Sequence, residues 1–446
     1  MRNETAEKLL RYIEKSTTAF HAVENLRIEL EKAGFTGLDE RDVWDLKPGG
    51  RYYVTRNHSS ILSFRLPAGR ITGFRIIASH SDSPCFKLKT APEMKGAGEC
   101  IRLNVERYGG MILHSWLDRP LSVAGRIIAD AEDGLKEILV DLDRDLLMIP
   151  SLAIHMDPRI NKGAELSVQH HLLPLFGQGI PGNAVPGGDG TAGPENRDGA
   201  PVLADLAAAA AGVEGDQVLG ADLFVYNRMK PVFWGADEEF ISSGRLDDLE
   251  CAYSSFLGFL ENAGTDRSDG AVNVHVVFDN EEVGSATAQG ADSTFLEEIL
   301  ERISLSGGAG REEYMAQLAS SFMLSADNAH AVHPNYVDKA DPVNRPVMNG
   351  GIVIKHNAAQ KYTTDGVSSA RVVRLCRENG IPYQHFTNHS DSPGGSTLGN
   401  LSQAHVSVRS ADIGLAQLAM HSSYESAGAR DPEWMRKLSE AFYREG

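Results

Sequence analysis

Acidic and imidazole side chains follow apolar runs at several points along this sequence. His80 and Asp82 follow the run "FRIIAS", Glu281 and Glu282 follow "VVFDN", and Asp327 follows "FMLSA". Apolar runs of this kind predict buried strands, and ligands of open α/β sheets sit beyond the carboxyl ends of the strands. Mixed imidazole and carboxylate ligands suit zinc, manganese or cobalt. The spacing therefore predicts metal chemistry at one edge of a sheet.

Three further residues extend this set. Asp247 and Asp248 stand in "GRLDDLECA", at the start of a predicted helix, and His421 stands in "LAMHSSYE". Taken singly, two acids at a helix start are explained by the helix dipole, and a histidine at a helix end needs no ligand. Taken together, these residues can supply two histidine ligands, three carboxylate ligands and a spare glutamate. That inventory suits two ions about 3.5–4 Å apart that share a bridging carboxylate, with the spare glutamate as general base.

The two glutamates are expected to have different roles. On an extended chain, neighbouring side chains point to opposite sides, so one of Glu281 and Glu282 would bind a metal while the other reaches a bound water. Two like charges this close raise each other's pKa unless a cation lies near. His80 and Asp82 would share one face of the chain, which lets Asp82 orient the imidazole. For Asp279, in the same segment, we expect a structural role.

The surrounding segments indicate an α/β protein. Residues 4–34 have helical periodicity broken near "STTAF", and the runs "ILSFRL" and "GFRIIASH" predict strands. After residue 235, helical and strand patterns alternate, which predicts a mixed, mostly parallel sheet sandwiched by helices.

Short β-like runs dominate residues 86–234. We therefore expect a catalytic domain formed by residues 1–85 and 235–446 and split by an inserted β-rich domain. Within the insert, residues 177–201 are rich in glycine and proline, which predicts a long, flexible loop.

Composition narrows the function classes. The chain has 446 residues, 42% of them hydrophobic and 23% charged, and a formal net charge of -18. Because this negative charge repels other polyanions, it argues against nucleic acids and anionic membranes as partners. No apolar stretch of about 18 residues exists, and the N-terminal segment lacks the apolar run of a secretory signal. The four cysteines are scattered without a CxxC motif. We expect a reduced, cytoplasmic protein.

Several stretches of the sequence resemble one family. "SHSDSPCFKLK", "DNEEVGS", "ADNAHAVHPNY" and "MHSSYE" are similar to the aspartyl aminopeptidases, the co-catalytic zinc aminopeptidases of metallopeptidase family 18. "STTAFHA", "IPSLAIHM" and "GGIVIKHNAAQKY" fit the same family, and together the seven motifs span residues 16–425. One departure is Asp248, where the family usually has asparagine.

The resemblance implies roles for single residues. One ion would be held by His80, Asp247 and Asp327, and the other by Asp247, Glu282 and His421, with Asp247 bridging. Glu281 would act as general base and Asp82 would orient His80. The substrate pocket would be lined by His330, Lys355 and Tyr362, together with His155 from a neighbouring subunit. The resemblance also implies two divalent ions per subunit (zinc, with manganese or cobalt as alternatives), a preference for N-terminal Asp or Glu, and a dodecamer that the inserted dimerisation domain helps to build.

Three function classes remain open from the sequence. The first is a metallo-aminopeptidase acting on peptides, with acidic or neutral residue preference. The second is a related di-metal hydrolase, such as a carboxypeptidase or an amidohydrolase, which would not require a free α-amine on its substrate. The third is a metal-stabilised scaffold, which would need the ligands but not a base such as Glu281.

Overall fold

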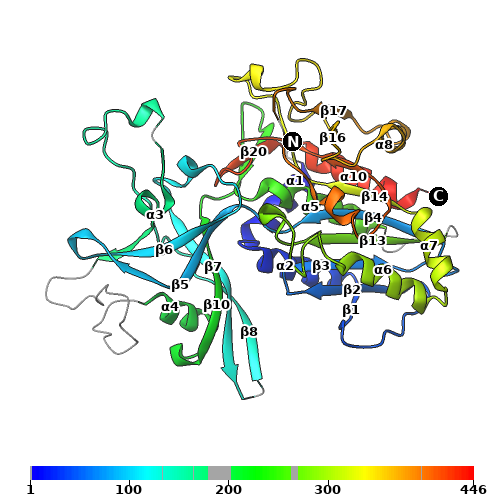
Figure 1. The fold of residues 1–446 in the computed structure, drawn as a ribbon, viewed down its shortest axis with the longest axis horizontal. Helices are drawn as coiled ribbons and strands as arrows, with labels where there is room; N and C mark the ends of the chain where they lie inside the picture. The colour runs from blue at the N-terminus through cyan, green and yellow to red at the C-terminus, as the bar shows by residue number, and fades with distance from the viewer. Residues whose placement is uncertain are drawn as a thin grey trace. The chain divides into compact units, whose positions relative to one another are not determined.

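The computed structural model of the chain describes residues 3–132, 134–163, 165–178, 202–262, 270–392 and 394–445. It divides into two compact units (Figure 1). The first unit comprises Met1–Ser83, Pro231–Met420 and Glu425–Gly446. The second comprises Pro84–Lys230 and His421–Tyr424. The dimerisation role predicted for the inserted segment stays a prediction.

A nine-stranded mixed sheet forms the centre of the first unit, in the order β1-β2-β3-β13-β4-β14-β18-β16-β17. Its strands are β1 Thr36–Gly37, β2 Arg51–Arg56, β3 Ser60–Arg65, β4 Gly73–His80, β13 Ala271–Phe278, β14 Phe322–Ala326, β16 Ile352–His356, β17 Tyr383–Thr387 and β18 Arg409–Gly414. Five neighbouring pairs of these described strands are parallel and three are antiparallel. The prediction of a mixed, mostly parallel sheet is confirmed.

Helices cover both faces of this sheet. One face packs against α1 Glu4–Lys15, α2 Ala19–Lys32, α5 Leu246–Glu261, α8 Gly366–Glu378 and α10 Asp431–Arg444. The other packs against α6 Phe295–Ser306, α7 Arg311–Ala319 and α9 Leu398–Ser402. Successive strand residues alternate between the two cores: Val276 lies in one and Val277 in the other. Because both faces are buried, the central strands read as continuous apolar runs in the sequence.

The first two helices form the pair that the sequence predicts. Asn3 caps α1 by accepting a hydrogen bond from the backbone N–H of Thr5, and Thr18 caps α2 by accepting one from the N–H of His21. Asn and Thr are favoured at this position because their side-chain oxygens satisfy an otherwise unpaired N–H of the first turn. The break near "STTAF" is therefore a second N-cap.

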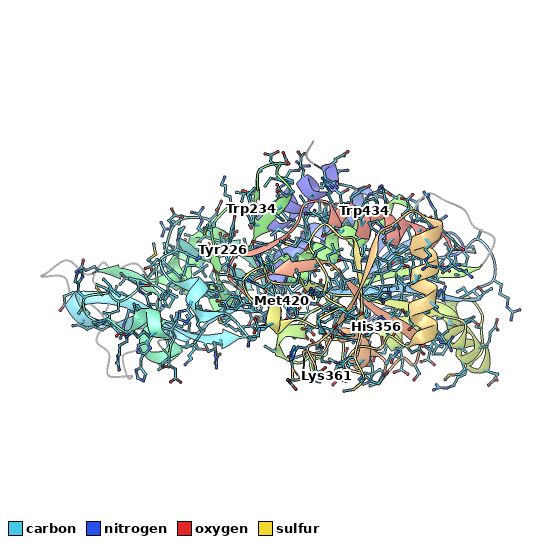
Figure 2. The ribbon with its side chains drawn as sticks, turned by 90° about the horizontal axis from the view of Figure 1, so that it is seen from above. Tyr226, Trp234, His356, Lys361, Met420 and Trp434 are labelled. Atoms are coloured by element: carbon cyan, nitrogen blue, oxygen red, sulfur yellow. The ribbon has the colours of Figure 1, made fainter. Side chains whose placement is uncertain are left out.

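A five-stranded sheet in the first unit has the order β11-β12-β20-β19-β15. Its strands are β11 Val232–Trp234, β12 Phe240–Ser243, β15 Ala329–His330, β19 Ala416–Leu418 and β20 Glu425–Gly428, and the 3-10 turns of this unit are η5 Glu281–Val283 and η6 Val337–Lys339. Trp234, labelled in Figure 2, donates its indole N–H to the hydroxyl of Ser242 at 2.8 Å. This small sheet carries His330 and Glu425, which matter below.

The second unit is built on an antiparallel sheet of six strands, in the order β8-β7-β10-β5-β6-β9. Its elements are β5 Cys85–Lys95, η1 Ala97–Glu99, β6 Cys100–Tyr108, η2 Leu113–Trp116, β7 Leu121–Ala131, β8 Gly134–Asp141, η3 Ile160–Lys162, α3 Val168–His171, β9 Leu175–Gln178, α4 Leu203–Ala211, η4 Gly215–Gln217 and β10 Val218–Asn227. The predicted loop at 177–201 begins too early, because residues 177–178 end a strand that pairs with β6. Residues 179–201 lie outside the described part of the chain.

Candidate metal centre

Three neighbouring parallel strands bring the predicted ligands to one edge of the sheet. β4 ends at His80, β13 ends three residues before Glu281, and β14 ends one residue before Asp327. β13 pairs with β4, and β4 pairs with β14, both in parallel, so their carboxyl ends meet. The first turn of α5 adds Asp247 and Asp248 at the same edge.

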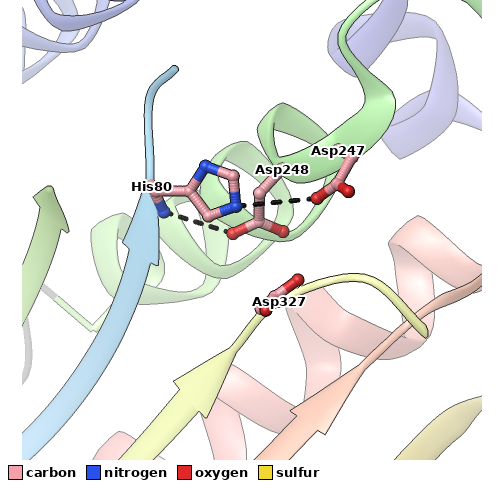
Figure 3. Close-up of side chains that lie close together, drawn as sticks. All are labelled: His80, Asp247, Asp248 and Asp327. Atoms are coloured by element: carbon pink, nitrogen blue, oxygen red, sulfur yellow. Dashed lines mark hydrogen bonds and ion pairs between the residues drawn. The ribbon is translucent and has the colours of Figure 1, made fainter. Parts of the chain in front are cut away.

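One histidine and three carboxylates converge there. Ligand atoms of His80, Asp247, Asp248 and Asp327 all lie within 4.8 Å of one another, and the four residues are buried (Figure 3). The Nε2 atom of His80 is 3.6 Å from Oδ1 of Asp247. A second group, formed by His80, Glu281 and Glu282, meets the same 4.8 Å limit. His80 therefore joins both groups.

The start of α5 is not a regular first helical turn. Asp247 has φ −80° and ψ 108°, and Asp248 has φ −117° and ψ 20°, so neither residue is helical. The backbone N–H of Asp247 donates to the carboxylate of Glu425 at 3.1 Å, and Asp248 accepts from the backbone N–H of His80 at 3.2 Å. These contacts orient both acids so that their side chains point into the cluster. A purely electrostatic role at the helix start, through the helix dipole, would not require this orientation.

The expectation of an extended chain at Glu281 and Glu282 is wrong. The two residues open the 3-10 turn η5, preceded by Asn280 in the left-handed region at φ 61°. Their backbone N–H groups donate to the two carboxylate oxygens of Asp82, each at 3.1 Å. This contact over 199 residues of sequence fixes the turn and brings both glutamates towards His80.

Asp82 also contacts the imidazole of His80. The Nδ1 atom of His80 lies 3.1 Å from the carbonyl oxygen of Asp82 and 3.3 Å from its Oδ1. Because Nδ1 makes these contacts, it is the Nε2 atom that faces Asp247. This is the arrangement that fixes the tautomer of a metal-binding histidine.

The electrostatics of the cluster fit a bound cation. Burial, followed by the negative charges of neighbouring acids, raises the pKa of Asp248 and of Glu282 well above their usual values. Burial likewise raises the pKa of Glu281, to about 8. So many carboxylates are costly to bury together as anions, and divalent ions would reverse these shifts. The mixed imidazole and carboxylate donors suit zinc, manganese or cobalt.

The predicted substrate residues of the first unit are linked through two aromatic side chains, Phe386 and Tyr362. The rings of His330 and Tyr362 lie 6.2 and 6.3 Å from the ring of Phe386. The ammonium group of Lys355 lies 5.5 Å from the centre of the Tyr362 ring. Lys355 and Tyr362 are buried, whereas His330 is exposed. The structure thus brings these three residues together.

Two predicted site residues belong to the second unit. His421 lies in the segment His421–Tyr424, where its Nδ1 contacts the carbonyl oxygen of Gly110 at 2.5 Å. His155 is exposed, in a turn between β8 and η3. Their roles as metal ligand and substrate residue stay predictions.

Sequence reasoning missed a buried network next to the cluster. Asn328 donates from its side-chain amide to Glu250 at 2.8 Å and to Gln417 at 2.9 Å, and its Oδ1 accepts from the thiol of Cys251 at 2.8 Å. Its backbone carbonyl accepts from Lys355 at 2.8 Å. No pattern in the sequence marks Glu250 or Gln417, since each lies within an ordinary helix or strand. The one signal of this network in the sequence was that Asn328 directly follows Asp327.

Comparison with known proteins identifies the family. The family model described as "Aminopeptidase I zinc metalloprotease (M18)" matches residues 12–443. The chain belongs to the M18 aminopeptidase family. This M18 aminopeptidase is 43% identical over 449 residues to a probable M18 family aminopeptidase 2 of Clostridium acetobutylicum, a match that covers 99% of this chain and 100% of the relative.

Solved structures agree with the family assignment. A chain in the cryo-EM structure of the Ape4 and Nbr1 complex superposes with a TM-score of 0.93 at 35% identity, over 99% of this chain and 85% of that one. The S. cerevisiae mApe1 dodecamer gives a TM-score of 0.84 at 28% identity, over 99% and 96%. The M18 aminopeptidase described here is therefore a metal-dependent hydrolase of N-terminal residues, and the scaffold and carboxypeptidase alternatives are set aside. None of its described helices is long and apolar enough to cross a membrane.

Proposed function

We propose that this aminopeptidase works with two divalent ions. Zinc is the preferred assignment, and manganese and cobalt are the alternatives. His80, Asp247 and Asp327 hold one ion, and Asp247, Glu282 and His421 hold the other. The convergence of buried His80, Asp247 and Asp327 within 4.8 Å carries the proposal. The family description as a zinc metalloprotease supports the choice of metal.

Glu281 is the general base of the proposed reaction. Bound dications would polarise the scissile carbonyl and lower the pKa of a water molecule. The Glu281 carboxylate then accepts a proton from that water and delivers it to the leaving amine. Its carboxylate lies beside His80, and its backbone is held by Asp82, so the base is fixed in place. Asp82 at the same time orients the His80 imidazole.

The substrates proposed are peptides with an N-terminal Asp or Glu, and neutral residues are the alternative. Lys355 is a buried cation beside Tyr362, close to the candidate ligand Asp327. A lysine at this depth can pair with an acidic substrate side chain through its remaining N–H group. His330 and Tyr362 would line the same pocket.

A homo-oligomer, built from dimers up to a dodecamer, is the proposed assembly. A dodecamer is recorded for S. cerevisiae mApe1, whose fold this chain shares. In such an assembly the second unit would mediate dimerisation, and its exposed His155 would reach the site of a neighbouring subunit. A cytoplasmic location is also proposed, since all four cysteines are free thiols, as in a reducing compartment.

Replacement of Glu281 by glutamine tests the mechanism. Glu281→Gln keeps the shape of the side chain but cannot accept a proton, so turnover should fall by about 10²–10⁴-fold with both ions retained. Glu282→Gln is the matched control next to it, and it should lose one ion. Metal content by mass spectrometry and kcat on aminoacyl substrates are the measurements. If the Glu281→Gln enzyme loses an ion yet keeps its turnover, the roles of the two glutamates are the reverse of those proposed.

A further inference from the structure

Asp248 is a fully buried acid inside the metal cluster. Its side chain is 0% exposed, and one of its oxygens lies within 4.8 Å of the ligand atoms of His80, Asp247 and Asp327 (Figure 3). Oδ2 accepts a hydrogen bond from the backbone N–H of His80. Oδ1 is also buried and accepts no hydrogen bond from any described residue.

Two other buried acids of the same unit have partners on both carboxylate oxygens, whereas Oε1 of the buried Glu250 has none among the described residues. In Asp412, Oδ1 accepts from the hydroxyl of Thr397 at 2.5 Å and Oδ2 accepts from Thr363. In Asp431, Oδ1 accepts from the N–H of Gly351 at 2.9 Å and Oδ2 accepts from the N–H of Asn349 at 2.6 Å. Buried polar atoms without a partner are rare and call for an explanation. A cation within the cluster would satisfy Oδ1 of Asp248.

We propose that Asp248 is a fourth protein ligand to the ion held by His80, Asp247 and Asp327. The inference rests on the metal site of the proposed function and deepens it. One imidazole and three carboxylates make an oxygen-rich donor set. Such sets favour harder ions such as Mn²⁺, whereas imidazole-rich sets suit Zn²⁺. Asp248 therefore raises the affinity for Mn²⁺ more than the affinity for Zn²⁺.

Asparagine at this position separates ligation from backbone support. Asp248→Asn keeps an oxygen that can accept the N–H of His80, but it loses the anionic donor. If Asp248 only holds the His80 backbone, the variant should behave as the original protein does. Asp431→Asn is the matched control, because Asp431 is equally buried and also accepts backbone N–H groups, but it stands outside the cluster.

The test is metal binding to stripped protein, measured by competition with a chromogenic chelator for Mn²⁺ and for Zn²⁺. Asp248→Asn should weaken Mn²⁺ binding by at least about 10–100-fold, the loss seen even for groups that only support a ligand. Zn²⁺ binding should weaken less, and Asp431→Asn should change neither. Equal affinities of Asp248→Asn and the original protein for both ions would overturn the inference.

Asp327→Asn separates this inference from the proposed function. If Asp327→Asn weakens binding and Asp248→Asn does not, only the role of Asp248 fails. If the original protein binds neither ion, the proposed metal site fails, and the inference fails with it.

A crystal structure of the zinc-loaded original protein gives a second measurement that does not depend on the folding of any variant. It should place an Asp248 oxygen about 2.0–2.2 Å from an ion. An Asp248 side chain bonded only to protein N–H groups would refute its role as a ligand.

Discussion

The ammonium group of Lys355 lies 3.5 Å from Oδ2 of Asp327. Both side chains are buried, and Lys355 also donates to the backbone carbonyl of Asn328 at 2.8 Å. Burial acts to lower the pKa of Lys355, but the groups around it, the Asp327 carboxylate first among them, together outweigh burial and raise that pKa above its ordinary value. The lysine is therefore a permanent cation between a candidate metal ligand and the proposed substrate pocket.

Replacement of Lys355 should change substrate preference. Lys355→Met keeps most of the side-chain volume but removes the charge that would pair with an acidic N-terminal residue. A buried charge left without its partner costs about 3–5 kcal/mol. We therefore expect kcat/KM to fall far more for Asp and Glu substrates than for Leu and Ala substrates. Equal losses across the panel, together with lost metal, would show that Lys355 acts only through Asp327.

Replacement of Asn328 should loosen the cluster. Asn328→Leu removes the side-chain contacts to Glu250, Gln417 and Cys251 while it keeps a similar volume. Each buried polar group left unsatisfied costs about 1–3 kcal/mol, so denaturant unfolding should show a clear loss of stability. We also expect weaker metal binding, because Asn328 follows Asp327 directly. Asn400→Leu, at a partly buried position in α9, is the control and should leave metal binding unchanged.

His275 should make stability depend on pH. Burial lowers its pKa to about 3, and its Nε2 contacts the hydroxyl of Ser255 at 2.9 Å. An unfolded histidine titrates near pH 6.5, so between about pH 6.5 and 3 the unfolded chain binds a proton that the folded chain does not. The contribution of His275 to the free energy of unfolding should therefore be intact above pH 6.5 and fall as pH drops below it, by up to about 1.4 kcal/mol per pH unit.

Denaturant unfolding between about pH 7.5 and 4.5 checks this as a difference between the original protein and its variants, because buried acids with raised pKa values, such as Glu281 at about 8, are common to all of them. His275→Gln should flatten the slope there, whereas His58→Gln, at an exposed position, should not. An unchanged slope in His275→Gln would assign the pH dependence to other groups.

His155 should act on a neighbouring subunit. His155→Ala and Glu281→Gln proteins, each of which we expect to be nearly inactive alone, are mixed under conditions that exchange subunits. Some interfaces then combine an intact His155 with an intact Glu281, and activity should return. Loss of one hydrogen-bond donor to the transition state costs about 2.7–4 kcal/mol, so recovery should be easy to measure. If mixed oligomers form and stay inactive, His155 acts at the active site of its own chain or takes no part in catalysis.

The strand ends were predictable because the central strands are apolar on both faces. Most residues of such strands are apolar, so polar residues such as His80 and Asp327 stand out where the strand stops, and the parallel order then brings them together. The conformation of Glu281 and Glu282 was not predictable, because their turn depends on the carboxylate of Asp82, far away in the sequence. The same holds for Asn328, which is fixed by side chains from three other elements, and for β9, which pairs with β6, a strand far from it in the sequence.

The three strands that carry the cluster are neighbours in space but distant along the chain. β4 ends at His80, whereas its partners β13 and β14 begin at Ala271 and Phe322. During synthesis on the ribosome, the first proposed ligand, His80, must wait for about 250 further residues, at about 5–20 residues per second, before Asp327 can reach it. The proposed metal site can therefore form only late in translation, and β4 has no β13 partner until residue 278 is made and no β14 partner until residue 326 is made. Ribosome-bound chains that stop before residue 322 should bind no metal at this site.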